Sequence, residues 1–233
     1  HPVEHGHAAP WNALLLGVDA WLNATLSLED YGLFGAVKRV VQLLGFLGLL
    51  GMENALIRAV ARSPSGPSGR DALRTALVAA TVASVSFAGL LALFAPSFAA
   101  WIDDSPDTVL VLRIAAISIP LASIRLLAVA GAQGWGAMAP RALVMFLAWP
   151  VVQVLAISLA AAVLGSTAIA AATGYTLAVG VGAGQALFHL WRVAKKIGPV
   201  RSESATVSPD EGRLGPMVAV AWPLWAQGGA MAL

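Results

Sequence analysis

Four basic side chains fall inside long apolar runs, where charged groups are rare. Lys38 and Arg39 are adjacent in EDYGLFGAVKRVVQLLGFLGLLGMENALIR, residues 29–58, and Arg113 and Arg125 lie in a later run. A charge deep in a bilayer costs about 2.5–3.5 kcal/mol on insertion scales, so such a residue usually has a function or a compensating partner. Arg113 is close to the polar turn DDSPD and is interpreted as an anchor at the membrane surface.

The spacing of these charges predicts a polar cavity between helices. At 100° per residue, Arg39 and Glu53 lie about 40° apart around a helix, and Gln42 and Glu53 about 20° apart. This predicts one polar stripe, with Lys38 at its margin. Asp19 and Arg125 supply polar positions on two other predicted helices. Three polar stripes indicate a shared, water-filled cavity with net positive charge. The candidate binding residues are Arg39, Arg125, Lys38, Asp19, Gln42 and Glu53.

Other interpretations of the same charges stay open at this stage. Lys38 could extend its amine to the lipid headgroups. Glu53 could pair with Arg58 near the inner surface. Arg39 and Asp19 could neutralise each other as a structural pair, which would stabilise the fold only modestly because burying both charges costs desolvation. Arg39 and Arg125 are the strongest candidates, since Arg125 has no nearby route to water.

The composition places the chain among membrane proteins. The 233 residues are 58% hydrophobic and 11% charged, with a mean hydropathy of +0.78, whereas soluble domains carry about 25% charged residues. The net charge is +2 and there is no cysteine, so neither a nucleic-acid surface nor a disulfide framework is indicated. We find no motif for catalysis, a metal or a cofactor, and we expect a protein that is not an enzyme.

The apolar blocks predict an all-α bundle of six membrane helices and the start of a seventh. The predicted domains are a six-helix bundle at 1–200, a cytoplasmic loop at 201–215 and the start of a second bundle at 216–233. Because both ends look cut, we interpret the sequence as a fragment. The predicted spans are Trp11–Leu26, Leu33–Ile57, Leu73–Trp101, Val109–Ala132, Ala142–Leu164, Ala168–Trp191 and a segment from Pro216 onward.

The distribution of basic residues predicts the orientation in the membrane. Ten of the 14 basic residues fall in alternate loops, while the loops between those hold none and two of them carry acidic residues. The positive-inside rule then places the basic loops and the N-terminus in the cytoplasm. The ten residues are Arg58, Arg62, Arg70, Arg74, Arg141, Arg192, Lys195, Lys196, Arg201 and Arg213.

Residues 26–62, LSLEDYGLFGAVKRVVQLLGFLGLLGMENALIRAVAR, resemble the polysaccharide (O-antigen type) flippases of the multidrug/oligosaccharidyl-lipid/polysaccharide exporter superfamily. LEDYGLF, GMENALIRAVAR and the restart at MVAVAWPLWAQGG carry the resemblance, which covers about one of the family's two six-helix bundles.

This resemblance implies a flippase of the bacterial inner membrane that moves an undecaprenyl-diphosphate-linked oligosaccharide to the outer leaflet by alternating access. Its implied partners are that lipid-linked substrate, the bilayer and a second, C-terminal bundle of the same protein. Lys38, Arg39 and Arg125 would then bind the anionic diphosphate, for which arginine offers a fixed donor geometry.

Two alternatives remain open. A small-molecule or drug antiporter of the same superfamily would use intramembrane acids, of which Asp19 and Glu53 are the candidates. A non-transporting membrane fragment would explain a single bundle.

Overall fold

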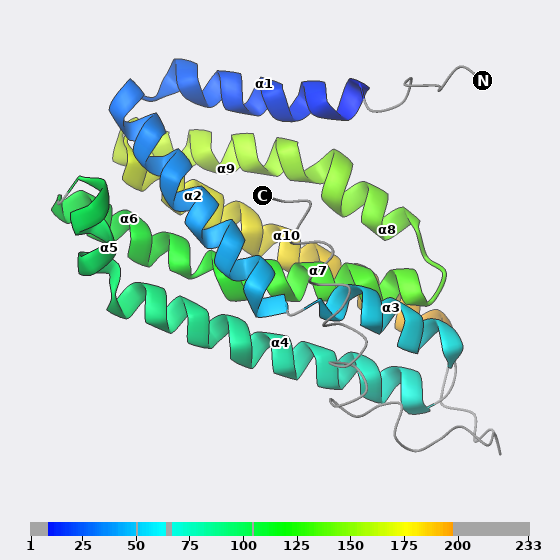
Figure 1. Ribbon diagram of the computed structural model, residues 1–233. Helices are drawn as coiled ribbons and strands as arrows, with labels where there is room; N and C mark the ends of the chain where they lie inside the picture. The colour runs from blue at the N-terminus through cyan, green and yellow to red at the C-terminus, as the bar shows by residue number, and fades with distance from the viewer. Residues whose placement is uncertain (1–8, 50, 64–66, 104, 198–233) are drawn as a thin grey trace, which may run out of the picture.

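The computed structural model describes residues 9–49, 51–63, 67–103 and 105–197 of the chain, and these are helical with short connections (Figure 1). The predicted seventh span and the predicted loop at 201–215 lie outside the described residues. The helices are α1 (Ala9–Thr25), α2 (Leu28–Leu49), α3 (Met52–Arg62), α4 (Pro67–Leu93), α5 (Ala95–Ile102), α6 (Pro106–Ala116), α7 (Ser118–Gly134), α8 (Ala139–Arg141), a π-helix η1 (Ala142–Ala148), α9 (Trp149–Leu164) and α10 (Ala168–Ile197).

The all-α membrane bundle predicted from the apolar blocks is confirmed. Within the described ranges, four helical segments are long and apolar enough to cross a membrane: Leu28–Arg62, Pro67–Leu93, Pro106–Gly134 and Ala139–Leu164. The other two predicted spans correspond to α1, which has 17 residues, and to α10, which is rich in glycine and alanine. A span needs about 20 apolar residues, so α1 is short for one.

Four of the predicted spans are interrupted. Leu73–Trp101 breaks at Phe94, between α4 and α5, shortly before Pro96, and the other three breaks are each explained by a nearby residue. Gly51 takes a left-handed conformation (φ 69°) between α2 and α3, which glycine adopts without steric cost. Pro120 has no N–H to continue the helical hydrogen bonds, and α6 ends four residues before it, at Ala116. Pro150 is the second residue of α9, and its ring and missing N–H disturb the preceding turn, which forms the π-helix η1.

The long helix α10 is the centre of the bundle. It packs most extensively on α7 and α9 and also contacts α2 and α6, and α2 crosses the bundle diagonally (Figure 1). Small residues allow this packing: a Cβ on Gly174 would lie 2.7 Å from the backbone nitrogen of Ile157 on α9. The small residues of α10 therefore serve close helix packing.

The outer surface of the bundle suits lipid. Along α9, four apolar side chains spaced one turn apart are 57–75% exposed: Val151, Leu155, Leu159 and Val163. Exposed apolar stripes of this kind mark contact with a membrane or a protein. The end of α3, the start of α4, the α7–α8 connection and the end of α10 lie at one end of the bundle, which we call the basic end (Figure 1). The α1–α2 and α9–α10 connections and α5 lie at the other end (Figure 1). The chain is a multi-pass membrane protein.

Candidate functional site

A pocket of about 630 Å³ lies between α1 and α2. Asp19 of α1 lines it together with Lys38, Arg39 and Gln42 of α2. These three α2 positions follow Gly35 at intervals of three, four and seven residues, so they share one helix face. A Cβ on Gly35 would meet nothing within 4 Å, which shows the open space beside α2. Four of the six predicted site residues therefore come together in one pocket.

The charges in the pocket are only partly neutralised. Lys38 Nζ lies 3.7 Å from Asp19 Oδ1, and the two side chains are 22% and 50% exposed. Arg39 is exposed, and among the described residues it forms no ion pair. The alternative pairing of Arg39 with Asp19 is therefore wrong, because the Asp19 carboxylate forms its ion pair with Lys38. A guanidinium that faces an open pocket without a carboxylate partner is available to an anion.

An aromatic layer lies behind the pocket. Phe34 lines the pocket, and its ring packs edge-to-face on Tyr175 of α10, with 6.0 Å between ring centroids. The side chain of Gln42 is within hydrogen-bonding reach of the Tyr175 hydroxyl. Tyr175 in turn packs edge-to-face on Trp149 of α9, also at 6.0 Å. The rings connect the pocket wall to the interior of the bundle and hold α2, α9 and α10 together.

Arg125 lies on the far side of this layer and does not line the pocket. It is 8% exposed, and its Cζ lies 3.9 Å from the centroid of the Trp149 ring, a cation–π contact. Its Nε and Nη1 atoms are buried without a hydrogen-bond partner among the described residues. Gly182 of α10 makes room for it, since a Cβ there would lie 3.0 Å from Arg125 Cδ. The side chain is therefore almost fully buried, and it pairs with no carboxylate of the described residues.

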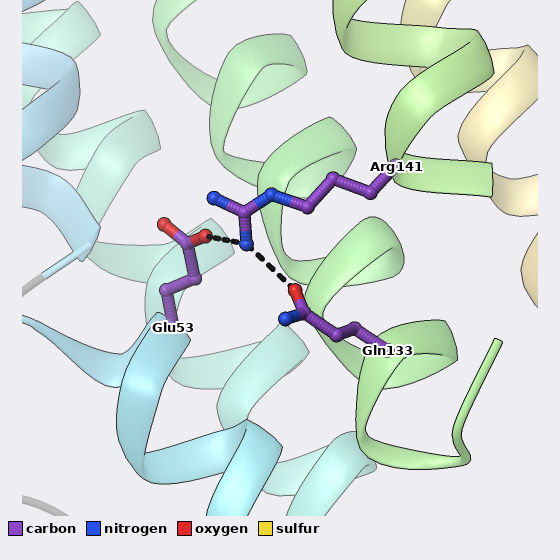
Figure 2. A network of polar contacts seen from close by, with 3 residues as sticks. All are labelled: Glu53, Gln133 and Arg141. Carbon is purple, nitrogen blue, oxygen red and sulfur yellow. Dashed lines mark hydrogen bonds and ion pairs between the residues drawn. The ribbon is translucent and has the colours of Figure 1, made fainter. Parts of the chain in front are cut away.

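Glu53 lies outside the pocket, so the predicted stripe of Arg39, Gln42 and Glu53 is wrong. The break at Gly51 shifts the helical phase, and Glu53 sits on α3 instead of on a continuation of α2. There its Oε1 lies 3.4 Å from Nη1 of Arg141, and that nitrogen also donates to Oε1 of Gln133 at 2.6 Å (Figure 2). The alternative pairing with Arg58 is also not the one formed. This network joins α3, α7 and α8.

The acidic turn before the pocket has a structural role. Ser27 Oγ donates to Asp30 Oδ2 at 2.7 Å and accepts from the Asp30 backbone N–H at 3.0 Å. The other carboxylate oxygen, Oδ1, accepts from the backbone N–H of Ala168 at 2.8 Å, the first residue of α10. A carboxylate at a helix N-terminus satisfies a free N–H and the helix dipole together. Asp30 thus ties the start of α2, beside the pocket, to the central helix.

Sequence reasoning did not select the tyrosines of this site. The chain has two tyrosines; Tyr31 lines the pocket and Tyr175 lies behind it. A usable signal existed, because a tyrosine inside a glycine-rich apolar helix needs a partner for its hydroxyl. Among the described residues no group of three or more histidines or acids could hold a metal ion. The exposed guanidinium of Arg39 is a group suited to an anion, and the half-exposed carboxylate of Asp19 is a group suited to a cation.

The model of a family of polysaccharide biosynthesis proteins matches residues 19–228. The chain belongs to this polysaccharide biosynthesis protein family. The match covers both walls of the pocket, the aromatic layer and Arg125. Searches of curated proteins and of solved structures gave no significant match.

Proposed function

We propose that this polysaccharide biosynthesis protein is a flippase, not an enzyme, that moves an undecaprenyl-diphosphate-linked oligosaccharide across the bacterial inner membrane. The diphosphate would enter the pocket between α1 and α2, while the undecaprenyl chain stays in lipid. Alternating access would involve a second bundle of the same protein, and the basic end of the bundle, with the N-terminus, would face the cytoplasm.

One observation carries this proposal: Arg39 is an exposed guanidinium in an open pocket, next to Lys38, and it pairs with no carboxylate of the described residues. Arginine binds phosphate through parallel N–H donors, and lysine acts as a compact charge beside it. In a membrane, these two cations lower the cost of bringing an anionic headgroup into the bundle. The Lys38–Asp19 pair leaves the net charge of the lining positive, since Arg39 remains.

The test is the amount of surface polysaccharide made by cells that carry the full-length protein. We expect Arg39→Gln to reduce it at least tenfold, since hydrogen bonds to charged groups contribute about 1.5–3 kcal/mol. A second variant, Gly35→Leu, keeps every charge and fills the pocket, because nothing lies within 4 Å of a Cβ at this position. It should also reduce polysaccharide.

The matched control is Arg113→Gln. Arg113 is another basic residue of a predicted span, but it is exposed on α6, where its Nε donates to the Ala92 carbonyl at 3.4 Å. It does not line the pocket, so polysaccharide should be unchanged at equal protein level in the membrane. Normal polysaccharide in both Arg39→Gln and Gly35→Leu would contradict the proposal.

A small-molecule antiporter is the second candidate, and the half-exposed carboxylate of Asp19 in the same pocket favours it. Such a transporter would bind a cation at Asp19 after Lys38 moves away. Drug susceptibility of cells that carry Asp19→Asn separates the two. The antiporter predicts increased susceptibility with normal polysaccharide, and the flippase predicts unchanged susceptibility.

A further inference from the structure

A second pocket, of about 340 Å³, lies at the basic end of the bundle. One wall is the segment that joins α7 to η1, with Pro140 and Leu143, and the other is the last two turns of α10. Since one water takes about 30 Å³ of liquid, a phosphate group with several waters fits in it. It is separate from the pocket between α1 and α2, with which it shares no lining residue.

The α10 wall of this pocket is basic. His189, Arg192 and Lys196 line it, and their spacing of three and seven residues places them on one helix face. Among the described residues, neither Arg192 nor Lys196 forms an ion pair, and no acidic residue lines the pocket. The nearby Arg141 is already held by Glu53 and by a glutamine of α7. Within the described part of the chain, the pocket therefore has positive charge and no counter-ion.

Aromatic rings next to the pocket place it at the level of the lipid headgroups. Phe188 and Trp191 are 51% and 54% exposed, and tryptophan favours the membrane–water interface. Lys195 Nζ lies 4.5 Å from the Trp191 ring, and Arg192 Cζ lies 5.7 Å from the Phe188 ring. These cation–π contacts hold Lys195 and Arg192 beside the exposed rings.

We propose that this pocket binds the phosphate of an anionic phospholipid, such as phosphatidylglycerol. Arg192 and Lys196 contact the phosphate, and the acyl chains lie over exposed apolar side chains such as Leu143, which is 39% exposed. Basic pockets between membrane helices suit anionic headgroups, and a mixed basic and apolar lining suits a lipid better than a free anion. The inference is independent of the transported substrate.

The test is a lipid titration of the purified full-length protein, with binding read by native mass spectrometry. Phosphatidylglycerol should bind more tightly than phosphatidylcholine. The double variant Arg192→Gln/Lys196→Gln should weaken phosphatidylglycerol binding about 25-fold, because each basic residue beside an anionic headgroup contributes about fivefold. Lys196→Gln alone should weaken it about fivefold, and it serves as a milder variant if the double one folds poorly.

The matched control is Arg58→Gln/Lys195→Gln, which removes the same charge from exposed positions at the same end of the bundle but outside the pocket. It should change phosphatidylglycerol binding less than about threefold. Equal losses in the two double variants, or no loss in either, would overturn the site. Displacement of the lipid by millimolar inorganic phosphate would overturn the lipid assignment in favour of a free anion.

Discussion

Replacement of Gly174 by alanine tests the contact between α9 and α10 on which the site is built. A Cβ at this position would lie 2.7 Å from Ile157 N and 2.8 Å from the Ala156 carbonyl oxygen. Both are backbone atoms and no side chain can rotate away. α9 must move by about 0.6 Å to bring that oxygen to an ordinary contact of 3.4 Å, and by more to relieve the still closer contact with Ile157 Cα. Trp149 is on the same helix as Ile157, so the movement changes its contact with Arg125.

The expected loss of stability follows from two opposing terms. Overpacking typically costs about 1–3 kcal/mol, and a clash of backbone with a rigid Cβ belongs at the upper end. Alanine regains about 1 kcal/mol of helix propensity over glycine. The net destabilisation is about 2 kcal/mol, which lowers Tm by about 4–8 °C for a chain of this size.

The assay is thermal unfolding of the purified protein, with Gly184→Ala as the matched control. Gly184 lies on the same helix, but a Cβ there meets nothing within 4 Å. Its replacement should leave Tm unchanged or raise it by up to about 3 °C. If Gly174→Ala and Gly184→Ala have the same Tm, the two helices do not pack as closely as described, and the placement of Trp149 over Arg125 is wrong.

Three further predictions concern polar contacts. Arg141→Ala leaves the half-buried Glu53 carboxylate without its partner and should cost about 1–3 kcal/mol in unfolding experiments, more than Arg141→Lys. Asp30→Ala removes the acceptor at Ala168 and should cost about 1–2 kcal/mol, whereas Asp30→Asn, which keeps an oxygen, should cost less. The Thr108 hydroxyl, 2.6 Å from Asp103, lowers the pKa of that carboxyl below its usual value. Because the folded-state pKa lies below the usual aspartate value, the ionised carboxyl stabilises the fold at any pH above that usual value. This stability is lost as the pH falls through the folded-state pKa, so Tm should drop over that acidic range. Asp103→Asn should remove this part of the drop.

The sequence predicts the fold class well because membrane spans are long and their composition is extreme. The apolar runs locate the bundle, and the polar turns between them locate the connections. The predicted helix of Leu33–Ile57 is present but is interrupted at Gly51. A periodic apolar pattern does not reveal that Gly51 takes a left-handed conformation. That single break explains why Glu53 faces Arg141 and not Arg39.

The candidate site is predicted in part, for a similar reason. The residues within one unbroken helix, Lys38, Arg39 and Gln42, keep their predicted face and line one pocket with Asp19. The rotation of α7 follows from the interruption before Pro120 and from packing against α10, α4 and α3, which the ideal helical angle does not include. Arg125 therefore lies behind the aromatic layer instead of in the pocket.

The most direct test of the central claim is the affinity of the purified full-length protein for an undecaprenyl-diphosphate-linked oligosaccharide. A cationic pocket between α1 and α2 predicts that Arg39→Gln weakens binding at least about tenfold, and that added salt weakens wild-type binding more than it weakens the variant. Arg113→Gln should bind as the wild type does. Equal affinity of Arg39→Gln and the wild type, at every salt concentration, would contradict the account.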